Sequence, residues 1–80
     1  MDYRDRRRNI KRNIEETLEE HGVIQVDCIG SDDVYLTISS VARIQEDIGK
    51  KIMVTDISYV TKKLDGKDRT GISMTFSVVV

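Results

Sequence analysis

The sequence has no proline and no tryptophan, and it has a single cysteine, a single histidine and a single phenylalanine in 80 residues. One cysteine excludes an internal disulfide, and one histidine with one cysteine excludes the common zinc-binding spacings. There is no glycine-rich phosphate loop, and no apolar run approaches the roughly 20 residues of a membrane-spanning helix. We therefore expect no metal, cofactor, catalytic site or membrane span. The arginine-rich, acid-containing start is unlike a secretory signal, and the lone cysteine fits a cytoplasmic protein.

The chain is short enough to form one domain, residues 1–80, with little apolar surface to bury. Hydrophobic residues make up 39% of the sequence and charged residues 34%, a composition typical of globular domains. Domains of this size are marginal when they fold alone, because a small domain buries a smaller share of its surface. We therefore expect a homodimer that adds buried surface.

The net charge of −1 conceals a separation of charge along the chain. Residues 1–12 carry six Lys and Arg against two acids, residues 13–49 carry one Arg against nine acids, and residues 50–80 carry six Lys and Arg against three acids. Because salt screens charges beyond about 8 Å, the two basic ends can act locally despite the acidic middle. The basic ends are the candidates for binding an anionic partner.

The first segment predicts an amphipathic helix that ends at Gly22. Ile10, Ile14 and Leu18 recur every four residues and form a narrow apolar stripe. Arginines and lysines crowd the start of this helix, where the helix dipole is positive, and glutamates crowd its end. Helix stability does not account for that order of charges. We leave open whether residues 1–7 form a disordered basic arm.

The central segment from Ser31 to Gly49 allows two interpretations. The preceding residues 23–29, VIQVDCI, predict a strand. After it, VYLTI favours a further strand in a hairpin. The alternative is one helix ended by Gly49, capped at its start by Ser31 or Asp32. Its inward stripe would contain Val34, Ile38, Val41 and Ile48. Propensity alone does not decide between the two.

The C-terminal third predicts a β-hairpin with a charged tip. Two runs rich in β-branched residues, IMVTDISYVTKK and GISMTFSVVV, are joined by LDGKDRT, and Asp65-Gly66 is a common hairpin turn. In the last run alternate residues are apolar, so one face of that strand should be core; these residues are Ile72, Met74, Phe76, Val78 and Val80.

Several of these patterns together resemble the Alba superfamily, and within it the branch of stage V sporulation protein S. They are EEHG at residues 19–22, VIQVDCIG at 23–30, the apolar positions Val34, Ile38, Val41 and Ala42, and LDGKDRTGI at 64–72. The resemblance covers residues 8–80. It implies a continuous helix over residues 32–48, and an α/β domain with two helices on one face of a three- to four-stranded, mostly antiparallel sheet. The family's first strand is largely absent here.

The resemblance also implies a function. Members of the superfamily are typically dimers that bind DNA or RNA through the start of the first helix and the last hairpin. We therefore predict a regulatory or architectural protein that contacts the nucleic-acid backbone with weak sequence specificity. The predicted contact residues are Arg4, Arg6, Arg7, Arg8, Lys11, Lys62, Lys63, Lys67 and Arg69.

Plainer interpretations of the same residues stay open. The arginines could be a solvated helix end, and the hairpin lysines could protect a sheet edge from aggregation. The acidic middle supports a rival function, a protein-interaction module that binds a basic or strand-donating partner. We expect His21 and the pair Asp32 and Asp33 to act at helix ends, and Cys28 to be a buried core residue.

Overall fold

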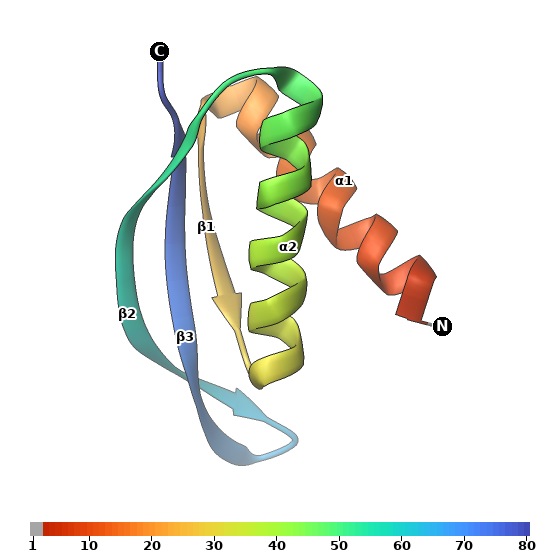
Figure 1. Ribbon diagram of the computed structural model, residues 1–80. Helices are drawn as coiled ribbons and strands as arrows, with labels where there is room; N and C mark the ends of the chain where they lie inside the picture. Colours follow the sequence, from red (N-terminus) through yellow and green to blue (C-terminus); the bar gives the residue numbers. More distant parts are fainter. Residues whose placement is uncertain (1–2) are drawn as a thin grey trace.

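The computed structural model describes residues 3–80, which form two helices and three strands (Figure 1). Their order is α1 (Tyr3–His21), β1 (Val23–Cys28), α2 (Ser31–Ile48), β2 (Ile52–Leu64) and β3 (Lys67–Val78). The predicted α/β class, with both helices on one face of an antiparallel sheet, is confirmed. Residues 3–7 are the first part of α1, and Met1 and Asp2 lie outside the described residues.

The sheet has the order β1-β3-β2, and β3 pairs antiparallel with both neighbours. The connection from β1 to β2 runs through α2, so β1 and β2 run in the same direction and β3 lies between them in the opposite direction. Figure 1 shows β2, β3 and β1 from left to right, with both helices on the side of β1 and none beside β2. The helices therefore cover only part of the sheet.

The core lies between the helices and the β1–β3 half of the sheet. The apolar stripe predicted for α1 is confirmed, since Ile14 and Leu18 are buried and Ile10 packs against the core. From β3, Met74 and Phe76 are buried in the core and Ile72 and Val78 pack against it, as the alternation of the last run predicted. The prediction was wrong for Val80, which is exposed because β3 ends at Val78. Burial of these side chains is the main source of favourable free energy for the fold.

The central segment is one helix, α2, so the hairpin interpretation of VYLTI is wrong. β-branched residues lose little by being helical when one side of the helix is buried, and tertiary packing outweighs propensity here. The expected cap is also wrong: the residue before the helix is Gly30, and no side chain of Ser31 or Asp32 caps it. Gly49 ends α2 as predicted, and its amide donates to the carbonyl of Gln45 at 3.2 Å.

The inward face of α2 differs from the predicted stripe. Ile38 and Ala42 point to solvent, whereas Leu36 and Ile44 are fully buried. The reason is that α2 contacts α1 as well as β1, so it buries a second row of residues beside the expected one. Ser40 belongs to that second row and is only 1% exposed.

The hairpin between β2 and β3 has the predicted two-residue turn. Asp65 and Gly66 have φ angles of 52° and 76°, and Leu64 pairs with Lys67 on either side of them. Positive φ at both central positions matches the turn that follows the twist of the strands. Within residues 3–80, neither α1 nor α2 combines the length and the hydrophobicity that crossing a membrane requires.

Candidate nucleic-acid interface

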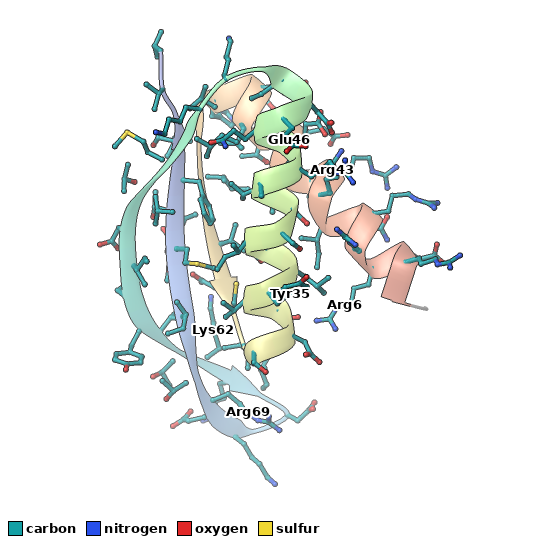
Figure 2. All side chains as sticks on the ribbon, in the orientation of Figure 1. Arg6, Tyr35, Arg43, Glu46, Lys62 and Arg69 are labelled. Atoms are coloured by element: carbon teal, nitrogen blue, oxygen red, sulfur yellow. The ribbon has the colours of Figure 1, made fainter. Side chains whose placement is uncertain are left out.

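One face of α1 and one face of α2 enclose a basic hollow of about 520 Å³. Arg4, Arg7, Arg8 and Lys11 are spaced three or four residues apart, so they share the face of α1 that borders the hollow. The opposite wall is α2, and Figure 2 shows Arg43 on the part of that helix near α1. The α2 residues of the hollow are Ser40, Arg43 and Asp47.

Two of the predicted contact residues in α1 are bound to carboxylates. Arg6 pairs with Asp33 at the start of α2. The Lys11 ammonium lies 3.0 Å from Asp47 and 3.3 Å from Glu15, and its hydrogen bond to Asp47 is the main reason why the pKa of Lys11 is raised. These two side chains tie α1 to α2 and have less capacity left for an external anion.

The other three arginines of this cluster have no such partner. Among the described residues, no salt bridge involves Arg4, Arg7 or Arg8, and all three side chains are exposed. Their guanidinium groups are therefore outside any salt bridge in the part of the chain that the structure describes. They lie in the first turns of α1, where the helix dipole adds partial positive charge.

The hairpin forms the second basic cluster, and its residues are exposed along both strands. Lys62 lies on the sheet face away from the helices and reaches across β3 to Asp27 of β1, with a distance of 2.8 Å between nitrogen and oxygen. The hydrogen bond from Lys62 is the main cause of a lowered Asp27 pKa. Lys63 pairs across the hairpin with Asp68. The exposed cations nearest to the tip are those of Lys67 and Lys63, and Arg69 follows opposite Lys62.

The two basic clusters lie toward the same end of the molecule but do not form one continuous surface. In Figure 1 the start of α1 and the hairpin are both in the lower part of the view, with the start of α2 between them. That start carries the acids Asp32 and Asp33, and Arg6 is bound there. An anion that contacts both clusters must span this acidic segment.

Sequence reasoning missed Arg43 and Ser40. Arg43 is the only Lys or Arg among residues 13–49, a segment that also contains nine acidic residues, so the sequence did not single it out. Once α2 is known to be helical, Ser40, Arg43 and Asp47 fall on one face because they are three and four residues apart. That α1 presents its arginines to this face follows from tertiary packing and could not be seen in the sequence.

Apolar side chains are exposed on the uncovered strand β2. On β2, Ile57 is 63% exposed and Tyr59 is 83% exposed, and both are on the helix-bearing face because they pair with Met74 and Ile72. Ile38 of α2 is 51% exposed. We call the exposed apolar residues on this face of β2 the open apolar face; its members are Val54, Ile57 and Tyr59.

The other residues considered as candidates for chemistry, Cys28 and His21, lie in positions that suggest structural roles. Cys28 is buried as predicted, with its sulfur 3.4 Å from the hydroxyl oxygen of Thr37. His21 is the last residue of α1 and is exposed, 3.8 Å from Glu20. Within residues 3–80, no three His, Cys, Asp or Glu side chains are grouped in a way that could hold a metal ion.

No family model matches this sequence, and no curated protein matches it. Its function is therefore inferred from the fold and from the surfaces described above.

Proposed function

We propose that this protein binds DNA or RNA through the phosphate backbone, as a dimer with a regulatory or architectural role. The observation that carries the proposal is the set of arginines in the first turns of α1 that lack a carboxylate partner among the described residues. Guanidinium groups bind phosphate oxygens in bidentate fashion, and exposed helix starts favour anions. The hairpin supplies a second contact through Lys67 and Arg69.

Binding of this kind has weak sequence specificity. Contacts from arginine and lysine to phosphates position a protein on nucleic acid but carry no direct sequence information. The basic residues of the hairpin alternate with acids and threonines, so that cluster offers charge without an aromatic stacking platform. Affinity should therefore depend on salt more than on base sequence.

The fold supports a distant relation to the Alba superfamily, and we propose that relation. The order of helices and strands, the Asp-Gly hairpin and the position of both basic clusters agree with the resemblance in the sequence. The described part of the chain lacks a strand beside the outer edge of β1, where the superfamily has its first strand.

The open apolar face supports a dimer. The chain exposes 5774 Å², compared with about 4,900 Å² for a typical folded monomer of 9.2 kDa. A second copy placed against Ile57 and Tyr59 would remove these side chains from water.

The proposal is tested by titrating labelled duplex DNA and duplex RNA with the protein at several salt concentrations. We expect binding at low salt that weakens steeply as salt rises, because each neutralised phosphate releases counterions. Arg7→Gln and Lys67→Gln should each lower the slope of log K against log salt by about 0.9 if each residue contacts a phosphate of duplex DNA.

Lys51→Gln is the matched control, because this exposed lysine precedes β2 and lies outside both basic clusters. It makes the same change in net charge and should leave the slope near that of the wild type. Absence of binding to either duplex at low salt would exclude the proposed function. If all three variants changed the slope equally, the binding would be a nonspecific response to net charge and would not depend on the two basic clusters.

One observation favours the rival function, a protein-interaction module. The outer edge of β1 has no strand beside it among the described residues, so its backbone groups could pair with a strand from a partner. This rival would be favoured if the protein captured one defined partner, if the capture survived nuclease treatment, and if it was lost in the β1 variant Gln25→Pro.

A further inference from the structure

The hollow between α1 and α2 contains a buried hydroxyl group without a partner. Ser40 is 1% exposed, and within the described part of the chain its Oγ makes no hydrogen bond. A hydroxyl at this position of a helix commonly donates to the carbonyl four residues earlier, which is that of Leu36. Here Ser39 donates to that carbonyl instead, at 3.2 Å. Buried polar groups are rarely left unpaired, so the Ser40 hydroxyl points to a missing acceptor.

Cations from two helices surround the same hollow. Arg4, Arg7 and Arg8 come from α1, and Arg43 comes from α2. Among the described residues none of these four guanidinium groups is in a salt bridge. The one carboxylate in the lining, Asp47, is already bound to Lys11. The hollow therefore combines excess positive charge with a free hydroxyl donor, and both favour an oxyanion.

We propose that this hollow binds a terminal phosphate group, in which the phosphate carries two negative charges and a single ester link. The Ser40 hydroxyl donates to one phosphate oxygen, and Arg43 with the α1 arginines neutralises the charge. The inference extends the proposed function, with which it shares the α1 arginines, but Ser40 and Arg43 are needed only here.

The charge of the site favours a terminal phosphate over a phosphate inside a chain, because a terminal phosphate carries close to two negative charges at neutral pH and a phosphate inside a chain carries one. A phosphate within a duplex also has a sugar on both sides. A terminal phosphate has one substituent and can enter end-on. The volume of about 520 Å³ lies in the range of small-molecule sites, so a mononucleotide or the phosphorylated end of a strand would fit.

The test is a titration of the full chain, followed by calorimetry and by amide chemical shifts. The probes are inorganic phosphate, adenosine 5′-monophosphate, adenosine, and a short single-stranded oligonucleotide with either a 5′-phosphate or a 5′-hydroxyl. We expect binding of the monophosphate but not of adenosine, with shifts at residues around Ser40 and Arg43. Binding of the mononucleotide identifies a free nucleotide as a source. Preference for the 5′-phosphorylated strand alone identifies nucleic-acid ends.

Three variants locate the binding. Arg43→Gln should weaken binding of the phosphorylated probe roughly tenfold, as expected for loss of a charged hydrogen bond. Ser40→Ala should weaken it severalfold while leaving the thermal midpoint unchanged or higher, because it removes an unpaired buried hydroxyl. Arg12→Gln is the matched control: Arg12 is an exposed arginine of α1 that does not line the hollow, and its guanidinium donates to Asn9 at 3.2 Å.

The outcomes separate this inference from the proposed function. If the phosphorylated probes do not bind although duplex binding is intact, the inference is wrong and the proposed function stands. If duplexes do not bind but Arg43→Gln abolishes mononucleotide binding, the proposed function is wrong and the inference stands. Equal effects of Arg43→Gln and Arg12→Gln, or an unchanged affinity in Ser40→Ala, would also overturn the inference.

Discussion

The two halves of the sheet have similar strands but very different surroundings. Over β1 and β3, the helices bury residues such as Met74, which is 3% exposed. Its partner across the strands, Ile57 of β2, faces the same way and is 63% exposed. Figure 1 shows the cause, since α2 does not extend over β2. An apolar face is therefore divided into a covered half that holds the monomer together and an open half that does not.

The two basic clusters lie on different halves of the sheet, so they are held in place differently. The hollow of α1 and α2 is built on the covered half, where packing fixes both helices. The hairpin extends from the open half and is held mainly by its own strand pairing. The first cluster can therefore form a shaped site, whereas the second offers charge at a projecting tip.

The largest expected effect compares the two cross-strand partners. Met74→Ala should destabilise the protein by about 2–5 kcal/mol, because it removes buried atoms and leaves a cavity. Ile57→Ala, on the same face, should cost less than about 0.5 kcal/mol in dilute protein, as for an exposed residue. Urea unfolding followed by circular dichroism measures both.

The comparison becomes sharper when unfolding is repeated at high protein concentration. If a second copy covers the open half, the cost of Ile57→Ala should rise with concentration, whereas that of Met74→Ala should not, because association stabilises by mass action. Equal costs for the two variants in dilute protein would show that β2 is covered within one chain.

The next effect concerns Gly71, where the hairpin joins the covered half. A Cβ atom at this position would lie 2.0 Å from the carbonyl oxygen of Cys28, a backbone atom that cannot turn aside as the end of a flexible side chain could. Gly71→Ala should cost at least about 1–3 kcal/mol, the range for overpacking. Gly66→Ala in the turn meets no atom within 4 Å and is strained only by its φ of 76°, so it should cost less, about 1 kcal/mol. A smaller loss for Gly71→Ala than for Gly66→Ala in urea unfolding would contradict the close approach.

A third effect tests whether the open apolar face binds a second copy. Tyr59→Asp should weaken dimerisation by about 2 kcal/mol or more, as for the loss of an interface aromatic residue. Thr61→Asp is the control, because Thr61 is exposed two residues further along the same face. Sedimentation equilibrium measures both. A wild-type protein that stays monomeric at all accessible concentrations would exclude this use of the face.

The sequence was sufficient for the elements that depend on local periodicity or turn chemistry. The stripe of Ile14 and Leu18 and the turn at Asp65-Gly66 were predicted because each signal lies within a few neighbouring residues. The inward face of α2 was predicted only in part, because Leu36 is buried by packing against a second helix.

The candidate site shows the same limit. The basic residues could be identified from the sequence, but their salt-bridge partners could not. Arg6 is close to Asp33 and Lys62 is close to Asp27 only in the folded protein. Arg43 could not be assigned for the same reason. Whether a charged side chain is in a salt bridge depends on the tertiary structure, even where the charged residue is obvious in the sequence.

The smallest expected effect tests the ion pair that links the open half to the covered half. Lys62 of β2 reaches Asp27 of β1 and lowers its pKa below the ordinary value of 3.8. A carboxyl group whose pKa is lowered by folding stabilises the protein above its unfolded pKa, and this contribution is lost as the pH falls through the folded pKa. Asp27→Asn should therefore be less stable than the wild type at pH 7, and the difference should shrink between about pH 5 and pH 2.

A double-mutant cycle assigns this pH dependence to the pair. In a Lys62→Gln background, Asp27→Asn should show a smaller difference at pH 7 and a weaker dependence on pH, because the main cause of the pKa shift is gone. The pair is exposed enough that the coupling will be small, so unfolding must be measured at low salt, where surface ion pairs are least screened. If the pH dependence is the same with and without Lys62, the two halves are joined by strand pairing alone, and Lys62 is available to the hairpin cluster for binding phosphate.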